Sequence, residues 1–516
     1  MGGDIIRTYN SIKNMIFSLI SNALTIIIGF VVQKVFLNIL GTEYLGINSL
    51  YTNIVSMLAI ADLGIGSAII YNLYEPVAKN NKNKIKSLMR FYRNTYRIIS
   101  LVIFIVGLII IPFLGIIVGK TTIAYLELVI LFLLFLIDTV ASYLLSYKRS
   151  LLYADQKIYI TSIVHLGYLI IMNSLLIISL LITKNFYLYL IIKIICRILE
   201  NIIISIIADK KYPYLKQKEV EKLSKKTKDD IILKVKGLFF HKLGSFFVLG
   251  TDNIIISMFL GVSVVGLYNN YYLVIYALTT LICQGFTSFT ASVGNLLALE
   301  TKEKTYQVFK RIRFLNFWVA SYTAISILVV MESFISSWYG SEYLLNTSVL
   351  IVLVINYYLT VMRYNISIFK EAAGIFHEDR YVPILESITN IVFSLILLKI
   401  CGLAGVFLGT ILSNLLLHLY SYPKYVFSQI FNEKKVEYFK CIIKYFILFI
   451  ITSAITYIIC SFIKIDNSFV KMIINLIISL VIPNFIYYLI LRKTDDFKYL
   501  KDLLNKIINN RLKGGN

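Results

Sequence analysis

Ten of the ionisable side chains that lie inside long apolar runs of the sequence are candidates for chemistry. At the centre of a bilayer each would cost about 2.5–3.5 kcal/mol on insertion scales, so these side chains are expected to face protein or water. Cations placed there attract anions such as a diphosphate, which arginine can hold bidentately. A buried carboxylate can instead exchange protons or hold sodium. The cations are Lys34, Lys193, Arg197, Lys242 and Arg363, and the acids are Asp62, Asp138, Asp252, Glu332 and Glu386.

Arg363 is the first candidate for an anion ligand, because it lies deep in its run and has no acid within one helical turn. Lys34, Lys193 and Arg197 are the further candidates for a diphosphate-binding cavity. Lys193, Arg197 and Glu200 follow an i, i+4, i+7 spacing, which places them on one face of a helix. A self-neutralising structural cluster is therefore the alternative interpretation of these three residues.

Asp62, Asp252 and Glu386 are the candidates for coupling to an ion. Moving one elementary charge across 100 mV is worth about 2.3 kcal/mol, so a proton gradient, a sodium gradient or the membrane potential could each supply energy through such a group. A static ion pair with a neighbouring cation is the competing interpretation of each acid.

Other chemistry is not indicated. The four histidines and five cysteines have no spacing suited to a metal, a disulfide framework or a nucleophile with its base. We therefore expect no metal site, no cofactor and no enzymatic activity.

Fourteen apolar runs must position these charges. A helix of about 20 residues crosses roughly 30 Å of hydrocarbon, and lipid requires each backbone polar group to be bonded within the protein. A content of 58% hydrophobic and 15% charged residues agrees with such a chain. The sequence predicts an all-α polytopic membrane protein with about fourteen transmembrane helices. The runs are 15–40, 47–74, 94–119, 123–147, 158–183, 185–208, 237–260, 264–298, 314–337, 345–370, 381–400, 403–426, 441–463 and 470–491.

The basic residues alternate between the loops. If the N-terminus is cytoplasmic, 41 of the 51 lysines and arginines fall in inside segments and five fall outside. Basic loops stay cytoplasmic, so both termini are expected inside. The net charge of +23 is then a signal of topology and of attraction to anionic membrane lipids, and no nucleic-acid partner is expected.

A repeated motif divides the chain. Leu40-Gly41 and Leu45-Gly46, which follow the first apolar run, recur after the seventh run as Leu260-Gly261 and Val265-Gly266. Two parallel six-helix lobes with a substrate site between them near the midplane are therefore predicted, as in transporters built from repeats. The predicted parts are an N-lobe (1–208), a basic cytoplasmic linker (209–236), a C-lobe (237–426), two further helices (427–491) and a cytoplasmic amphipathic tail (492–516).

The chain resembles the Wzx-type oligosaccharide flippases of the multidrug/oligosaccharidyl-lipid/polysaccharide exporter superfamily. The resemblance rests on residues 40–51 (LGTEYLGINSLY), 61–68 (ADLGIGSA), 73–76 (LYEP), 266–272 (GLYNNYY), 381–386 (YVPILE) and 402–410 (GLAGVFLGT). It implies a twelve-helix core plus two helices that moves undecaprenyl-diphosphate-linked oligosaccharide outward by alternating access. Similar flippases often carry an arginine near the outer end of helix one, where this chain has Gln33 and Lys34.

The leading hypothesis is a flippase for lipid-linked oligosaccharide repeat units in the bacterial plasma membrane, serving surface polysaccharide biosynthesis. A glycan polymerase and glycosyltransferases of the same pathway would be its partners. A flippase for the peptidoglycan precursor lipid II and a cation-coupled multidrug exporter are the alternatives within the superfamily. A membrane glycan polymerase or ligase is disfavoured, because the outer loops are too short to hold catalytic groups.

Overall fold

The structure, a computed structural model, describes residues 2–59, 65–217, 250–375, 381–431 and 435–502 and a few single positions beside these ranges. Side chains are described from residue 22 onward, except at 67, 417–418 and 435. Asp62, Lys242, most of the linker beyond residue 217 and the tail beyond residue 502 lie outside the described residues.

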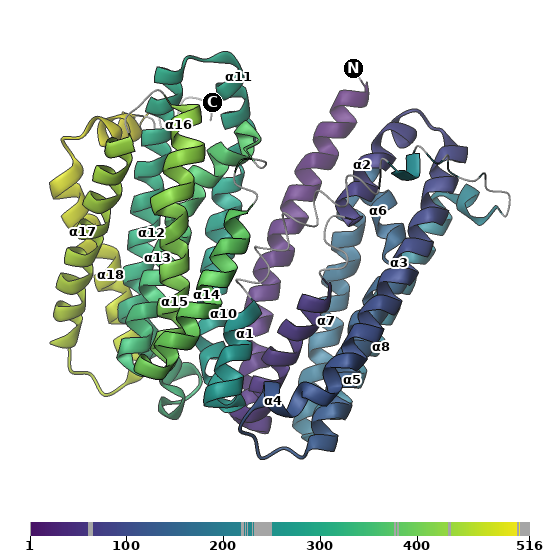
Figure 1. Cartoon of the computed structure of the whole chain (residues 1–516), viewed down its shortest axis with the longest axis horizontal. Helices are drawn as coiled ribbons and strands as arrows, with labels where there is room; N and C mark the ends of the chain where they lie inside the picture. The colour runs from purple at the N-terminus through teal and green to yellow at the C-terminus, as the bar shows by residue number, and fades with distance from the viewer. Residues whose placement is uncertain are drawn as a thin grey trace, which may run out of the picture. The chain divides into compact units, whose positions relative to one another are not determined.

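Two compact units divide the chain, Met1–Asn269 and Asn270–Asn516 (Figure 1). The helices that lie in the first unit are α1 (Gly2–Leu58), α2 (Ile65–Ala78), α3 (Lys82–Ile110), η2 (Ile111–Phe113), α4 (Leu114–Val118), α5 (Tyr125–Leu144), α6 (Tyr147–Ala154), α7 (Ile158–Thr183), α8 (Phe186–Lys211) and η3 (Pro213–Lys216). Helix α10 (Val262–Thr287) begins in the first unit and ends in the second. The helices of the second unit are α11 (Thr290–Leu299), α12 (Lys302–Trp338), η4 (Ser341–Tyr343), α13 (Thr347–Ala373), α14 (Val382–Cys401), α15 (Leu403–Leu416), η5 (Leu417–Phe427), α16 (Ser428–Ile430), α17 (Lys435–Ser461) and α18 (Ser468–Leu491).

The predicted all-α polytopic class is confirmed, and the described residues contain no strand. Eleven helical segments of this part are long and apolar enough to cross a membrane. One of them, 22–58, holds the end of the first predicted run and the start of the second, which Gly41 separates with a φ of 83°. Helix α8 has the length of a span but carries three charges near its middle. With these two and the partly described run 237–260, the fold accommodates about fourteen transmembrane helices.

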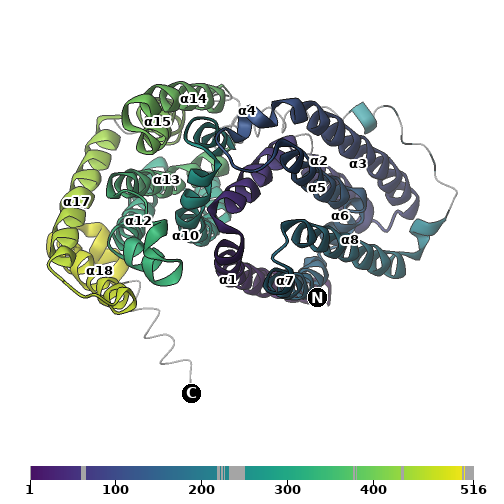
Figure 2. The ribbon, with the colours of Figure 1, turned by 90° about the horizontal axis from the view of Figure 1, so that it is seen from below.

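Helices of the first unit pack around α5, which contacts both α3 and α8, while α1 packs along α7 (Figure 2). The short helix α6 fills the space between α2 and α8, where Leu151 and Leu152 are fully buried. Tyr92 of α3 and Ala208 of α8 join the same buried cluster. This cluster fixes two helix ends that carry basic residues, the start of α3 with Lys86, Arg90 and Arg93 and the end of α8 with Lys210 and Lys211.

In the second unit, α12 is the central helix and contacts α13, α17 and α18. Polar side chains bond across these helices, as is common where lipid offers no partner. The indole N–H of Trp318 donates to Asn484 at 2.6 Å, and the Asn475 amide donates to the carbonyl of Val329 at 2.8 Å. Helix α18 is thereby fixed to α12.

The repeated glycine motifs contact each other reciprocally. Gly41 and Gly261 both have a positive φ, 83° and 97°, which glycine adopts without strain. A Cβ added at Gly46 would lie 1.9 Å from the carbonyl oxygen of Val262, and one at Gly266 would lie 2.1 Å from that of Thr42. Thr42 and Val262 each follow directly after the first glycine of their motif, so each motif packs on the equivalent position of the other.

The tyrosine that follows each motif has an equivalent role. The Tyr51 hydroxyl donates to the carbonyl of Leu128 at 3.0 Å, at the start of α5. The Tyr271 hydroxyl accepts from the backbone N–H of Leu345 at 2.9 Å, just before α13. Both tyrosines are fully buried. These contacts give the sequence repeat a structural counterpart in each half of the chain.

Candidate functional site

A polar cavity of about 240 Å³ lies among the membrane-spanning helices of the first unit. Its walls come from the second part of α1, from α5 and from α8. Arg197 lies eleven residues after the start of α8, or roughly 16 Å along the helix, which places the cavity well inside the span. The polar and charged side chains that line it are Thr52, Ser56, Asp138, Thr139, Ser142, Tyr143, Lys193 and Arg197.

Two cations share one carboxylate in this cavity. The Arg197 Nε–H donates to Oδ1 of Asp138 at 2.8 Å, and the Lys193 ammonium lies 3.5 Å from Oδ2. The ammonium also lies 5.2 Å from the ring centroid of Phe135, and the guanidinium lies 6.0 Å from that of Tyr168. The cluster therefore keeps one net positive charge in a setting where charge is expensive to bury.

Glu200 is held elsewhere, although it shares a helix face with Lys193 and Arg197. Its Oε1 accepts from Nη2 of Arg149 at 3.1 Å and lies 3.0 Å from Nδ1 of His165. The acid that directly neutralises the face of α8 is thus Asp138 of α5. The predicted self-neutralising set of Lys193, Arg197 and Glu200 therefore differs from the structure in its ion-pair partner.

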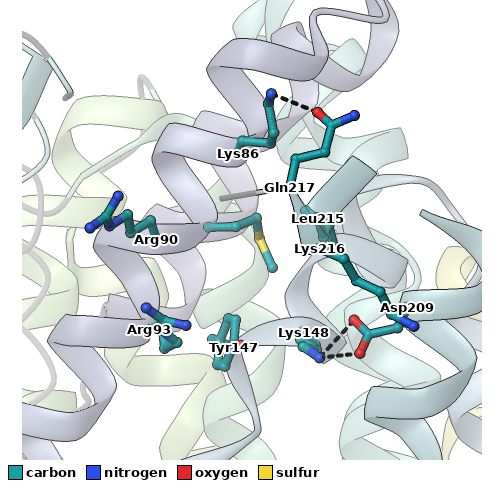
Figure 3. Close-up of a pocket in the computed structure, with 10 residues that line it drawn as sticks. Lys86, Arg90, Arg93, Tyr147, Lys148, Asp209, Leu215, Lys216 and Gln217 are labelled. Atoms are coloured by element: carbon teal, nitrogen blue, oxygen red, sulfur yellow. Dashed lines mark hydrogen bonds and ion pairs between the residues drawn. The ribbon is translucent and has the colours of Figure 1, made fainter. Parts of the chain in front are cut away.

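A larger basic pocket, of about 580 Å³, lies at the end of the same unit where α3, α6, α8 and η3 meet. Five cations line it against one acid, Asp209, and Figure 3 shows their side chains around the opening. The cations are Lys86, Arg90, Arg93, Lys148 and Lys216.

Only part of this positive charge is compensated. The Lys148 ammonium donates to both Asp209 oxygens, at 2.7 and 2.8 Å, and to Ser205 at 2.8 Å. Lys86 donates to Oε1 of Gln217 at 2.9 Å (Figure 3). Burial raises the pKa of the Tyr147 hydroxyl in the wall, and the nearby Arg93 opposes that rise. The pocket is suited to an anion that carries more than one charge.

This pocket was not predicted from the sequence. Lys86, Arg90 and Arg93 follow an i, i+4, i+7 spacing, but the predicted apolar run begins only at residue 94. Helix α3 begins at Lys82, so all three lie on one helix face. An unbroken cationic face with no acid beside it was the signal available in the sequence.

Arg363 lies in the second unit, in a network of hydrogen bonds to three side chains. Its Nη1 donates to Oδ1 of Asn414 at 2.7 Å and to Oε1 of Glu386 at 3.2 Å, and its Nε donates to the Tyr422 hydroxyl at 3.2 Å. Glu386 is buried, with 5% of its surface exposed. The geometry thus pairs two predicted site residues, the anion ligand and a coupling acid, with each other.

Lys34 and Asp252 are half-buried in the first unit and line neither of its two cavities. Gln33, beside Lys34, accepts a hydrogen bond from the Asn269 amide at 3.2 Å. Asp62 lies outside the described residues. In the part of the chain that the structure describes, no group of three or more metal-ligating side chains is found.

Comparison with known proteins identifies the family. Residues 11–292, more than half of the chain, match the family described as polysaccharide biosynthesis protein. The chain belongs to this family. No curated protein matches the sequence.

Solved structures share the fold. The lipid II flippase MurJ in an inward closed conformation is 16% identical, with a TM-score of 0.67 over 93% of this chain and 99% of MurJ. An inward-facing multidrug resistance MATE transporter of the MOP superfamily is 14% identical, with a TM-score of 0.54 over 76% of this chain and 91% of the transporter. The Vibrio cholerae MATE transporter VcmN in its bent form is 12% identical, with a TM-score of 0.50 over 80% and 94%. The family match confirms the predicted link to polysaccharide biosynthesis, and these transporters share the fold of the chain.

Proposed function

We propose that the chain moves undecaprenyl-diphosphate-linked oligosaccharide repeat units from the inner to the outer leaflet of the bacterial plasma membrane by alternating access. The observation that carries the proposal is the polar cavity of the first unit, where Lys193 and Arg197 face the single carboxylate of Asp138. Membership of the polysaccharide biosynthesis family supports the substrate class.

The sign of the charge in the cavity favours an anionic substrate. A cavity that keeps a net positive charge among apolar helices attracts a diphosphate and repels a drug cation. Hydroxyl groups of Thr52, Ser56 and Thr139 line the same cavity and offer hydrogen bonds to a glycan. The lipid chain can stay in the bilayer throughout, so the step needs no covalent chemistry.

The basic pocket of Figure 3 is suited to a first step in which the substrate is captured. Its cations lie in the segments expected to face the cytoplasm, where the lipid-linked glycan is made. We assign this pocket to the first capture of the diphosphate before the glycan enters the cavity between the spans. Glycosyltransferases would supply the substrate on this side, and a polymerase would consume it on the other.

The proposal is tested in proteoliposomes that carry a fluorescent polyprenyl-diphosphate oligosaccharide, with the fraction in each leaflet read by a membrane-impermeant quencher. Hydrogen bonds to charged groups contribute about 1.5–3 kcal/mol, so Lys193→Ala should lower the apparent affinity for the diphosphate substrate by roughly 10- to 150-fold. Lys193→Arg should retain most of the activity, because the charge remains. Lys399→Ala, at an exposed lysine near the end of α14, is the matched control and should behave as wild type.

A second arm uses the same glycan attached to a lipid without phosphate. The wild-type protein should move it poorly. Equal transport of the charged and uncharged lipids, or an unchanged rate in Lys193→Ala, would overturn the assignment of the cavity to the diphosphate.

A further inference from the structure

An apolar pocket of about 290 Å³ lies in the second unit between α12, α13, α17 and the segment that α15 and η5 form. Its size is at the lower end of the range for sites of small ligands. Leu419 and Ile443 belong to its wall and are 60% and 57% exposed, so the pocket opens on the surface that faces lipid. The deeper wall is formed by apolar and aromatic side chains that include Tyr358, Leu415 and Phe446.

One end of this pocket is polar. Arg313 is 7% exposed and lines the pocket, and its Nε and Nη1 have no hydrogen-bond partner in the part of the chain that the structure describes. The Tyr438 hydroxyl and Oδ1 of Asn365 also line the pocket, are buried and have no partner there. The guanidinium carbon lies 5.1 Å from the ring centroid of Phe309, which covers it without accepting a conventional hydrogen bond.

The polar groups gather at the cytoplasmic end predicted for these helices. Arg313 lies in the first third of α12, and Tyr438 lies in the first turn of α17. From Tyr438 to Phe446 the wall on α17 runs roughly 12 Å toward the middle of the membrane, because a helix rises 1.5 Å per residue. The pocket therefore changes from polar to apolar in the direction of an inner-leaflet lipid.

Charge at the polar end is positive. Asp496, on the segment after α18, interacts electrostatically with Arg313, and burial raises the pKa of its carboxyl. Lys310, Arg313 and Arg311 oppose that rise and the neighbouring Asp495 adds to it, so three cations act beside two acids. The guanidinium of Arg311 makes a cation–π contact with Tyr499, with its carbon 3.5 Å from the ring centroid. Arg313 is the cation that faces the pocket.

We propose that this pocket holds an anionic phospholipid of the inner leaflet, with its phosphodiester on Arg313 and Tyr438 and one acyl chain between α13, α15 and α17. A guanidinium donates charge-assisted hydrogen bonds to phosphate oxygens, and a phosphate in the pocket would accept from an unpaired nitrogen of Arg313. The Tyr438 hydroxyl can donate to the same phosphate. Apart from this end the wall of the pocket is apolar and offers a glycan few hydrogen-bonding groups, so the occupant is a resident lipid and not the transported one.

The test measures lipid retention and does not depend on transport. Delipidated protein in mild detergent is incubated with equal amounts of phosphatidylglycerol and phosphatidylcholine, and the lipids that remain bound are counted by native mass spectrometry. Wild-type protein should retain one phosphatidylglycerol per chain, with a preference of tenfold or more. Arg313→Met should lose this preference, whereas Arg311→Gln, a change two residues away on the same helix, should keep it.

A second variant blocks the site of the acyl chain and leaves the charge of Arg313 in place. Leu415→Trp should remove the bound lipid while Arg313 is intact, which covers the case that Arg313→Met does not fold. Equal retention of both lipids by the wild type would overturn the proposal, as would an unchanged preference in both variants. Displacement of the phospholipid by the polyprenyl-diphosphate glycan would make the pocket a substrate site and would equally overturn it.

Discussion

Alanine at Gly46 or Gly266 tests the reciprocal contact between the repeated motifs. The new methyl group would lie 1.9 Å from the Val262 carbonyl oxygen in the first variant and 2.1 Å from the Thr42 carbonyl oxygen in the second. Ordinary van der Waals contact begins at 3.4 Å. Because both distances fall far short of this value, the backbone segments must move apart in either variant.

The expected cost follows from two opposing effects. Overpacking a close contact costs typically about 1–3 kcal/mol, and alanine regains roughly 0.5–1 kcal/mol relative to glycine in a helix. The contacted atoms are backbone, which cannot move aside as a flexible side chain can. We therefore expect each variant to lose about 1–2 kcal/mol of its free energy of unfolding.

The two substitutions should not be additive. Both force apart the same pair of segments, so the separation made by the first accommodates much of the second. Coupling energies between contacting residues are about 0.5–3 kcal/mol. The double variant should therefore be destabilised clearly less than the two single variants together.

Denaturant titration in detergent micelles measures these free energies. Gly167→Ala in α7 and Gly285→Ala in α10 are the controls, because a Cβ at either position would meet nothing within 4 Å. Both should be neutral or slightly stabilised. A Gly46→Ala protein as stable as Gly167→Ala, or a double variant whose loss equals the combined losses, would refute the reciprocal contact.

Three further outcomes are expected. Arg363→Ala should reduce the yield of folded protein, because it leaves Glu386 buried without its guanidinium, at a cost of about 3–5 kcal/mol; lost transport at full yield on size-exclusion chromatography would instead assign Arg363 to the substrate. Cysteine labelling in a cysteine-free background should find Lys82, Lys222 and Lys434 inside and Glu43, Ser341 and Asn467 outside, and outer labelling at position 222 would contradict the two-lobe topology. Transport should respond to a proton or sodium gradient and lose that response in Asp62→Asn or Asp252→Asn; a response kept in both variants would leave these acids as static partners.

The membrane fold could be predicted from the sequence because its determinants are local. Length, hydropathy and loop charge identify spans without any knowledge of their neighbours. The repeat was equally visible, since Gly41 and Gly261 occupy equivalent places. That the two copies pack on each other was not visible, because a motif shows which positions are small but not what approaches them.

Two features were missed for one physical reason. Helices α3 and α12 begin at Lys82 and Lys302, well before the apolar runs 94–119 and 314–337 from which they were predicted. A span predicted from hydropathy stops at the edge of the hydrocarbon region, but the helix itself continues into the polar region beyond the membrane. The cationic face of Lys86, Arg90 and Arg93 and the buried Arg313 lie on these extensions, so a boundary drawn at the lipid assigned them to loops.

Partners of buried charges were the other unpredictable part. Asp138 of α5 pairs with Lys193 and Arg197 of α8. Asp138 and Arg197 are 59 residues apart in the sequence. Glu200, on the same helix face as both cations, pairs instead with Arg149 and His165. Spacing along one helix gives the face of each side chain, but the opposite helix decides which charge meets it.

The hydrogen-bond partners of Arg363, Arg197 and Arg313 separate these three arginines by role. Arg363 donates through Nε and Nη1 to three side chains of its own unit, one of them the buried acid Glu386, which ties its guanidinium to the fold. Arg197 donates through Nε to an acid that it shares with Lys193, so part of its capacity and a net positive charge are available to a substrate that visits the cavity. Arg313 has two nitrogens for which the described residues offer no partner, which suits a ligand that stays bound. Alanine or methionine at these positions should therefore act first on folding, on transport and on lipid retention, respectively, and a single common effect of all three changes would contradict this ranking.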